Sequence, residues 1–466
     1  MRVSEISVEG LFGIFNHVIP LSHSDRVTII HGPNGLGKTM MLRMIAALTN
    51  GRISIFERVP FEQFSVRFHD GSSVIIRHRA ASAADESKRR SKLDVTLFGS
   101  DGTALQQSTN EDFPEVPRSV LDKIDQKVPR PFGRSGTGWR NEETGQFYSL
   151  DEILDRFPAV VDSLPAKYYV NAFSTAFDGI DAFFVETTRL SAETSSREDE
   201  ISRYYSRAMQ NDLIVSSQEL RPVLGLRVDQ YSKDVVQRIK SALADYAKNS
   251  QESDRTFPER LVRFVRDREH VLSERDILQK MADLEVKRQR LISLGFLDSE
   301  SGLNDLTEDD VRRAQEALTI YVDDVQKKLA VFDDLSQRVG KLIDIVNERF
   351  RYKSLTLHRE RGFRLKTRAG KTIQLEDLSS GEQHELVVLY ELLFRAPRDG
   401  LILVDEPEIS LHVAWQSRFL TDLMDILKLT GSYGIVATHS PVIIGTRWDL
   451  TQELKGPEEQ DLERPQ

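Results

Sequence analysis

The sequence contains no cysteine among its 466 residues. Disulfide bonds, cysteine-ligated zinc sites and thiol nucleophiles are therefore excluded, and the composition favours a reducing compartment. The chain also has no apolar run close to the ~18 residues that are needed to span a membrane. Residues 1–11 carry Glu5 and Glu9 and no long apolar stretch, so we expect no secretory signal. These absences predict a soluble, cytoplasmic protein with no membrane partner.

Basic residues are also outnumbered by acidic ones. The chain has 63 Lys and Arg residues against 73 Asp and Glu residues, which gives a net charge of −10. A protein that coats nucleic acid needs clustered Lys and Arg to neutralise phosphates, so this balance disfavours that class and leaves only a local basic patch open. The length exceeds what one compact core usually holds, so we expect two to three structural units.

A glycine-rich loop follows the third of three strand-like segments near the N-terminus. Apolar residues at 3–8, 18–19 and 27–30 predict these strands. The third strand runs into Gly32-Pro-Asn-Gly-Leu-Gly-Lys-Thr39, and the residues after this loop are typical of a helix. Glycines in such a loop let backbone N–H groups surround phosphate oxygens, and the helix N-terminus adds positive charge. The loop therefore predicts nucleotide binding, with a lysine for the phosphates and a threonine for Mg²⁺.

An acidic strand end provides a second candidate for phosphate chemistry. Residues 401–404 are apolar and predict a buried central strand, which Asp405 and Glu406 follow directly. Parallel sheets bind ligands at the carboxyl ends of their strands, where one of the two carboxylates suits Mg²⁺ and the adjacent one suits a base that orients the attacking water. Alone, this pattern is equally typical of a helix N-cap. Its pairing with the glycine loop favours the catalytic interpretation.

Two further motifs depend on this context for their meaning. The run 378–382, Leu-Ser-Ser-Gly-Glu, predicts a helix start in which Ser380 is the cap and Glu382 complements the helix dipole. His439 follows an apolar strand at 435–436. A single histidine at such a position is more often structural, and the neighbouring motifs favour a functional role for it.

A heptad repeat dominates the middle of the chain. Apolar residues stand seven positions apart in two successive segments: Ile277, Leu284 and Leu291, and then Val311, Leu318, Val325, Phe332, Val339 and Val346. This spacing predicts an antiparallel coiled-coil hairpin with its turn near residues 294–305. The second helix is expected to begin after the N-cap Thr307 and, if unbroken, to reach Arg351. An ordinary helical subdomain is the alternative interpretation.

These signals predict an α/β protein in which a P-loop core with an antiparallel β-subdomain is split by a long α-helical coiled-coil insertion. We expect the first half of the core at 1–190, with an irregular segment of short helices at about 105–165. The insertion is expected at 191–352 and the second half of the core at 353–450. The polar residues 451–466 are expected to be disordered.

The order of the glycine loop, the helical insertion, the Leu-Ser-Ser-Gly-Glu run and the acidic strand resembles the ABC-type ATPase family. The resemblance implies ATP and Mg²⁺ as cofactors, and a homo-oligomer in which pairs of chains sandwich ATP. It implies phosphate contacts from Gly32, Asn34, Gly35, Gly37, Lys38 and Thr39, Mg²⁺ ligands in Thr39 and Asp405, catalytic roles for Glu406 and His439, and a contribution to a second chain's site from Ser379, Ser380 and Gly381. The family usually also has a glutamine between the glycine loop and the helical insertion, and the expected position, 187–189, holds none.

Within this family the chain is similar to the OLD and SMC-like group, on Asn34, the helical hairpin and the run 406–412. The stretches 11–17 and 378–386 are similar to the AriA ATPases of PARIS anti-phage systems. That resemblance implies a sensor that holds a separate TOPRIM-type nuclease of the AriB kind and releases it in response to a phage-encoded trigger protein. Only 27 residues follow His439, so the nuclease is expected on another chain.

Two other functions stay open. An SMC-like DNA-repair ATPase predicts DNA-stimulated ATP hydrolysis and a basic face. A Septu-like defence ATPase paired with an HNH nuclease shares the same motifs and differs in its neighbouring gene. A transporter ATPase fits poorly, because such subunits lack so long a helical insertion. Whether nucleic acid is a partner is undecided by the sequence.

Overall fold

The computed structural model describes most of the chain and divides it into two compact units. The described residues are 2–49, 54–78, 93–109, 118–128, 130–136, 138–142, 145–148, 150, 153, 181–186, 221–267, 270–298, 307–411 and 413–457. The first unit consists of Met1–Leu224 and Arg395–Gln466, and the second of Gly225–Phe394. The second unit is thus inserted into the sequence of the first.

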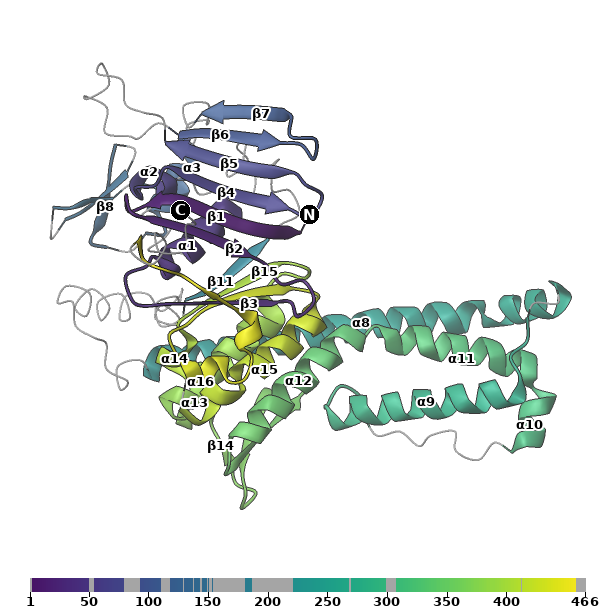
Figure 1. The fold of residues 1–466 in the computed structure, drawn as a ribbon. Helices are drawn as coiled ribbons and strands as arrows, with labels where there is room; N and C mark the ends of the chain where they lie inside the picture. Colours follow the sequence, from purple (N-terminus) through teal and green to yellow (C-terminus); the bar gives the residue numbers. More distant parts are fainter. Residues whose placement is uncertain are drawn as a thin grey trace. The chain divides into compact units, whose positions relative to one another are not determined.

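A five-stranded parallel sheet lies at the centre of the first unit (Figure 1). Its order is β11-β15-β16-β3-β17, and each neighbouring pair is parallel. The strands are β3 (Val27–His31), β11 (Ala182–Glu186), β15 (Leu401–Asp405), β16 (Tyr433–Ala437) and β17 (Thr451–Glu453). Every residue of β15 is buried, which confirms the predicted central strand, since continuous apolar runs suit a covered parallel sheet. Helix α1 (Lys38–Thr49) packs against β11, β15 and β16.

A six-stranded antiparallel sheet shares the core of this unit with α1. Its order is β2-β1-β4-β5-β6-β7. The strands are β1 (Val3–Leu11), β2 (Phe15–Pro20), β4 (Gln63–Phe68), β5 (Ser73–His78), β6 (Leu93–Phe98) and β7 (Ala104–Thr109). Alternate side chains of the sheet, such as Ile6 and Phe64, join Met41 of α1 in one buried cluster. This sheet confirms the predicted antiparallel β-subdomain.

Two stretches of the first unit differ from the sequence prediction. The described part of 105–165 contains the expected short helix, α3 (Arg118–Asp125), and also a small sheet of β8 (Phe132–Ser135), β9 (Gly138–Asn141) and β10 (Phe147–Tyr148). These strands are two to four residues long, too short for alternation to appear in the sequence. The tail predicted from 451 to be disordered begins with β17, which pairs with β3 and is followed by the buried Leu454. Residues 458–466 lie outside the described part of the chain.

Long helices form the arm of the second unit, as Figure 1 shows. They are α8 (Arg221–Asp267), α9 (Glu274–Ser293), α10 (Glu308–Arg313), α11 (Gln315–Ala330) and α12 (Asp333–Arg349), with α8 entering the unit at Gly225. The N-cap Thr307 forms a capping box with Asp310, which confirms the predicted helix start. The predicted long helix from 307 to 351 is divided into α10, α11 and α12, with breaks at 314 and 331–332.

The helical insertion is confirmed, but its arrangement has three layers of helix in place of a simple hairpin. Helix α9 lies along α11, where Ile277 contacts the cluster of Val311 and Val322. The turn after α9 lies against β12. At this contact Gly295 is so close to β12 that an added Cβ would stand 2.5 Å from the Leu357 carbonyl oxygen. A heptad repeat shows which face of a helix is apolar and does not show which partner covers it. The sequence therefore predicted a turn near residues 294–305 but could not show which element that turn contacts.

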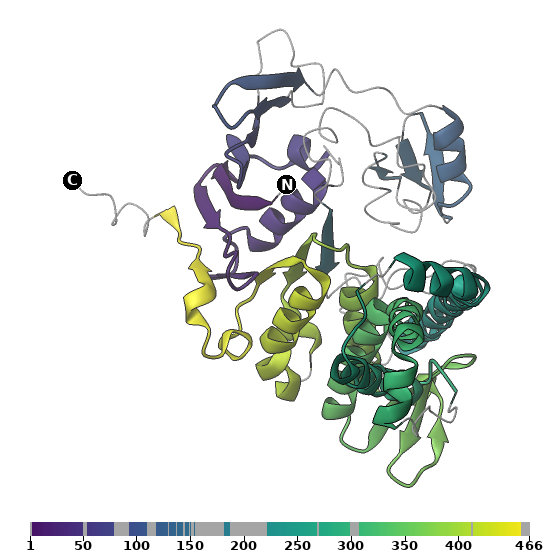
Figure 2. The ribbon, with the colours of Figure 1, turned by 90° about the vertical axis from the view of Figure 1, so that its right-hand side faces the viewer.

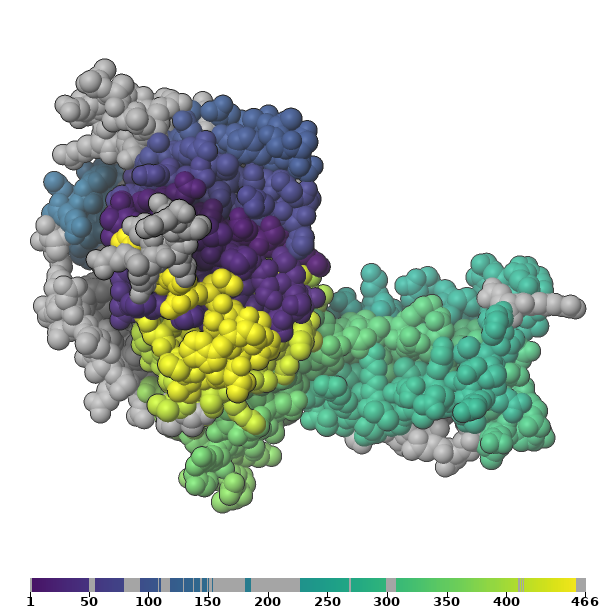
Figure 3. Space-filling model, viewed as in Figure 1, coloured from purple at the N-terminus to yellow at the C-terminus, as the bar shows by residue number. Residues whose placement is uncertain are grey.

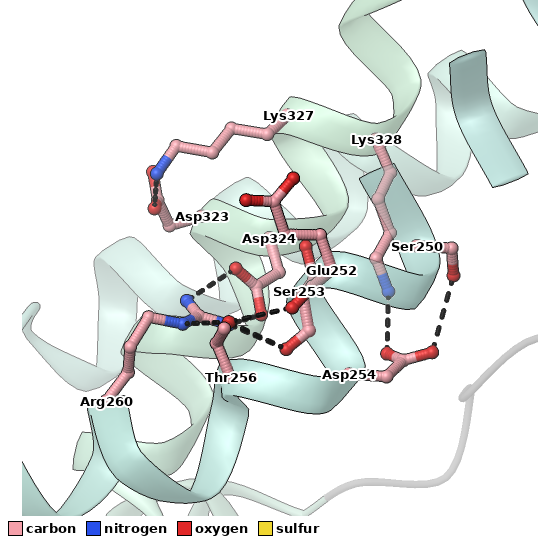
Figure 4. Close-up of polar contacts among 10 residues, drawn as sticks. All are labelled: Ser250, Glu252, Ser253, Asp254, Thr256, Arg260, Asp323, Asp324, Lys327 and Lys328. Carbon is pink, nitrogen blue, oxygen red and sulfur yellow. Dashed lines mark hydrogen bonds and ion pairs between the residues drawn. The ribbon is translucent and has the colours of Figure 1, made fainter. Parts of the chain in front are cut away.

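Polar contacts hold α8 to α11 in the middle of the arm (Figure 4). The Arg260 guanidinium donates to both carboxylate oxygens of Asp324, each at 2.7 Å, and to the Ser253 carbonyl at 3.0 Å. The Lys328 ammonium donates to the Asp254 carboxylate at 3.0 Å. A bidentate guanidinium–carboxylate pair, with two parallel hydrogen bonds, is among the strongest and most directional polar contacts in proteins. The register of α8 against α11 is therefore set by Arg260.

Arg260→Ala is expected to destabilise the α8–α11 contact by about 3 kcal/mol, because it leaves the nearly buried Asp324 carboxylate without its cation. Arg263→Ala is the matched control. Arg263 and its partner Glu259 have side chains that are 59% and 75% exposed, and such a pair is worth less than about 0.5 kcal/mol. Hydrogen exchange of the α8 and α11 amides in the full chain measures both. Equal protection in the two variants would show that Arg260 does not join the helices.

A small sheet and helix α13 complete the second unit. The strands β12 (Lys353–His358), β13 (Gly362–Thr367) and β14 (Thr372–Ile373) pair antiparallel in that order. Helix α13 (Ser380–Tyr390) is buried from Gln383 onward and packs against α12, where its Glu385 forms a buried ion pair with Arg349. Among the described helices of both units, none is long and apolar enough to cross a membrane.

Candidate functional site

The glycine loop between β3 and α1 has the conformation that its sequence requires. Gly32, Gly35 and Gly37 have φ values of 150°, 89° and 86°, which disfavour residues with a side chain. Close packing adds a second constraint, because a Cβ on Gly32 would stand 2.7 Å from the Leu454 carbonyl oxygen and one on Gly37 would stand 2.6 Å from Leu11 Cδ2. Helix α1 begins at Lys38, so the N–H groups of its first turn point out of the helix end toward the loop.

Lys38 is folded back over this loop. Its ammonium donates to the carbonyl oxygens of Gly32 and Pro33, both at 2.9 Å, and the residue is only 5% exposed. Burial lowers the pKa of Lys38, against the opposing effect of the carboxylates of Glu406, Asp405 and Glu408. The cation is thus held at the mouth of the glycine loop, among three carboxylates, and within reach of an anion bound by the loop.

The end of β15 brings the acidic motif to the same place. The Thr39 hydroxyl donates to Asp405 Oδ1 at 3.1 Å, although the two residues are 366 positions apart in the sequence. The next residue, Glu406, has a left-handed backbone with φ 45° and ψ 55°, and its N–H donates to the Ala437 carbonyl at 2.8 Å. A glutamate in this region is strained, and such strain gathers at functional sites. The turn aims the Glu406 side chain at the end of β16.

His439 follows β16 and meets the acidic residues. Its Nε2 lies 3.8 Å from Glu406 Oε1. Burial lowers the pKa of His439, and the neighbouring Lys38 ammonium lowers it further, against the opposite effect of Glu406 and Glu408. The ring is therefore largely neutral at pH 7 and can donate or accept a proton. The structure thus gathers the sequence-predicted Lys38, Thr39, Asp405, Glu406 and His439 at one edge of the parallel sheet.

Sequence reasoning missed two residues that shape this edge. Glu408 Oε1 accepts hydrogen bonds from the Thr438 hydroxyl and from the His439 N–H, both at 2.8 Å. The buried His17 ring bonds the Leu36 carbonyl in the glycine loop at 2.9 Å. Both residues stood in stretches that were noted for family resemblance, at 406–412 and 11–17, and neither spacing indicated a structural partner.

The serine-glycine motif belongs to the second unit and starts α13. Ser379 is the N-cap, with its hydroxyl accepting from the Glu382 N–H and the Glu382 carboxylate accepting from Ser379 in a capping box. The prediction that Ser380 is the cap is therefore wrong by one position, since Ser380 is the first helical residue. Lys353 holds the Glu382 carboxylate at 2.7 Å and secures the turn that presents Gly381. The positions 187–189, expected for the family glutamine, and residue 412 lie outside the described residues.

The donor set at the first unit's edge fits Mg²⁺. A hydroxyl from Thr39 and a carboxylate from Asp405 are hard oxygen ligands, already in hydrogen-bond contact with each other. Mg²⁺ commonly takes one or two protein ligands and completes its shell with phosphate oxygens and water. The site suits a metal that arrives with a nucleotide.

Comparisons with known proteins give short or distant matches, and one family match. A stretch of 67 residues is 39% identical to Protein ea59 of Escherichia phage lambda and covers 14% of this chain and 13% of that protein. The SMC head domain of Thermotoga maritima is similar at 12% identity and a TM-score of 0.30, over 98% of this chain and 95% of that one. The Smc head domain of Pyrococcus furiosus, bound to the C-terminal domain of ScpA, is similar at 14% identity and a TM-score of 0.29, over 95% and 91%.

TM-scores near 0.3 do not establish a shared fold. The strand order and the motifs describe the fold of this chain instead. The family match is more extensive. The model described as "AAA domain, putative AbiEii toxin, Type IV TA system" matches residues 177–445, more than half of the chain. That span contains the serine-glycine motif, the acidic strand β15 and His439, while the glycine loop precedes it. The chain therefore belongs to this family of P-loop ATPase domains.

Proposed function

We propose that this chain binds ATP with Mg²⁺ and hydrolyses it. The observation that carries the proposal is the meeting of Lys38, Thr39, Asp405, Glu406 and His439 at one sheet edge. Lys38 and the loop N–H groups would hold the phosphates, while Thr39 and Asp405 would hold Mg²⁺, which neutralises phosphate charge when bound. Asn34, Gly35 and Gly37 belong to the same phosphate-binding loop.

In this proposal Glu406 accepts a proton from the attacking water, and His439 donates a hydrogen bond to the terminal phosphate. The left-handed turn at Glu406 supports the first role, because it directs the carboxylate away from β15 and toward His439. Glu408 positions His439 by accepting from its N–H. A neutral imidazole suits the second role, since it can donate to an anion and later release the product.

The serine-glycine motif supports a homodimer. Ser379, Ser380 and Gly381 present a capped helix N-terminus, which favours an anion. We propose that this helix end from one chain completes the site of a second chain, so that ATP is sandwiched between two copies. The oligomer would then assemble with ATP and loosen after hydrolysis.

We further propose that the ATPase is a cytoplasmic sensor in a bacterial anti-phage complex, of the PARIS kind, in which AriA is the ATPase and AriB the nuclease. The family's description names a toxin of a type IV toxin–antitoxin system, which supports a defence setting. The ATPase would hold a separate TOPRIM-type nuclease inactive, and a phage-encoded trigger protein would release it.

Affinity purification of this chain, expressed from its own operon, tests the defence setting. We expect a nuclease to co-purify before phage infection and to be lost after it. Recovery of no nuclease in either state would overturn the sensor function and leave the ATPase proposal intact. Recovery of an HNH nuclease in place of a TOPRIM nuclease would assign the chain to the Septu-like alternative.

A further inference from the structure

One short segment of this acidic chain is strongly basic. Residues 351–371 contain eight Lys and Arg side chains and one acidic side chain, Glu360, in a protein whose net charge is −10. The basic residues are Arg351, Lys353, Arg359, Arg361, Arg364, Lys366, Arg368 and Lys371. The segment coincides with the β12–β13 hairpin of the second unit and the turn toward β14. Figures 2 and 3 show this hairpin, in light green, projecting from the unit into solvent.

The two faces of the hairpin differ completely. Leu355 and Phe363 represent the inner face, which is buried, and Leu357 and Leu365 continue it. The outer face carries polar residues in register, with Thr356 opposite Arg364 and Ser354 opposite Lys366. No large apolar side chain of 353–367 is exposed. The outer face therefore offers hydroxyl and cationic donors, together with the exposed ring of His358.

Most of these cations have no acid partner. Lys353 is paired with Glu382 and Arg359 with Asp298. None of the other six forms an ion pair with any residue in the described part of the chain. Arg368 lies over the Tyr352 ring at 5.3 Å, which leaves its charge available. An unneutralised cluster of this density costs self-repulsion, so an external anion would stabilise it.

The hairpin is held rigidly on the unit. Asn347 of α12 donates to the Leu355 carbonyl at 3.0 Å and accepts from its N–H at 2.6 Å. The Ser232 hydroxyl of α8 accepts from the Phe363 N–H at 2.9 Å, and Gly362 approaches Ser232 so closely that a Cβ would collide with it. The donors are therefore presented from a fixed surface, which suits binding without an ordering cost.

We propose that the outer face of β12 and β13 binds the phosphate backbone of double-stranded DNA. Phosphates accept from Lys, Arg and hydroxyl donors, which are what this face presents. A two-stranded ribbon matches the width of the B-DNA major groove, whereas the A-form RNA major groove is deep and narrow. A protein partner brings an apolar centre, which the outer face lacks. Single strands stack on several aromatic platforms, whereas the exposed large aromatic side chain beside this face is Tyr352, whose ring Arg368 covers.

Fluorescence anisotropy of a labelled duplex with the full chain, without nucleotide, tests this proposal. We expect the unsubstituted protein to bind with strong salt dependence. The triple variant Arg364→Gln, Lys366→Gln and Arg368→Gln removes three phosphate contacts, so the slope of log affinity against log salt should fall by about 2.7. Near 0.1 M salt, binding should weaken by roughly 100-fold or more.

The control variant removes the same charge from another surface of the second unit. It combines Lys240→Gln, Lys248→Gln and Arg255→Gln, which are exposed on α8 and form no ion pair with the residues that the structure describes. We expect it to keep the unsubstituted slope. If the hairpin triple variant loses hydrogen-exchange protection in β12 and β13, Lys366→Gln alone should still lower the slope by about 0.9.

Three outcomes would overturn the proposal. One is the absence of salt-dependent duplex binding by the unsubstituted chain. Another is an equal loss of affinity in the two triple variants, which would assign binding to overall charge. The last is tighter binding of single-stranded DNA, of duplex RNA or of poly-glutamate than of duplex DNA. Because the assay contains no ATP, its failure leaves the proposed ATPase activity untouched.

Discussion

Glu406→Gln is expected to slow ATP hydrolysis by about 10³-fold while ATP binding is retained. Glutamine has nearly the shape of glutamate and cannot take a proton from water. The phosphate and Mg²⁺ contacts proposed for Lys38, Thr39 and Asp405 are unchanged by the substitution. Loss of a negative charge beside the terminal phosphate also favours the bound state. The variant should therefore accumulate ATP-bound dimers.

Phosphate release under saturating ATP measures the rate, and light scattering after size-exclusion chromatography measures the mass with and without ATP. Glu316→Gln, on the exposed face of α11, makes the same chemical change far from the site in sequence and should behave as the unsubstituted protein. An unchanged hydrolysis rate in Glu406→Gln would show that another group is the base. Loss of ATP binding would show that the Glu406 turn is needed to form the site.

Lys38→Ala is expected to weaken ATP binding by about 100- to 1,000-fold. The ammonium now donates to the Gly32 and Pro33 carbonyls, and two charged hydrogen bonds transferred to phosphate are worth roughly 1.5–2 kcal/mol each. The carboxylates of Asp405 and Glu406 stay in place after the substitution and repel phosphate. Hydrolysis should be lost as a consequence of the lost binding.

Isothermal titration with a non-hydrolysable ATP analogue and Mg²⁺ measures this effect. Lys38→Met keeps the apolar stem of the buried side chain and separates the loss of charge from the loss of packing. Lys428→Ala, at an exposed position of α15 (Val413–Thr430), is the control in the same unit. If Lys38→Met bound ATP as tightly as the control, the phosphates would not lie where the glycine loop places them.

Local chemistry made much of the fold readable in advance. The glycines at 32, 35 and 37 could be recognised because left-handed backbone angles leave few alternatives to glycine. The strand at 401–404 could be recognised because a sheet buried on both faces needs a continuous apolar run. The helix start at Thr307 could be recognised because the two partners of its capping box are only three residues apart in the sequence.

Features that depend on distant partners were not readable. The two-to-four-residue strands β8, β9 and β10 are stabilised by pairing and not by their own patterns. The three-layered arm could not be anticipated, because an apolar heptad face packs equally well on several helices. Glu408 gave no signal, because its partners at 438 and 439 come from another strand end.

By itself, the sequence determined the elements and the chemical groups: a phosphate-binding loop, an acidic strand, a capped serine-glycine helix and a long helical insertion. Only the tertiary structure decided which of these groups meet. Thr39 and Asp405 are in contact across 366 positions because β3 and β15 end at the same edge of one parallel sheet. Likewise, pairing of β12 with β13 turns the apolar residues of a basic run inward and places Arg364 and Lys366 on the opposite face, which is the surface proposed to bind DNA.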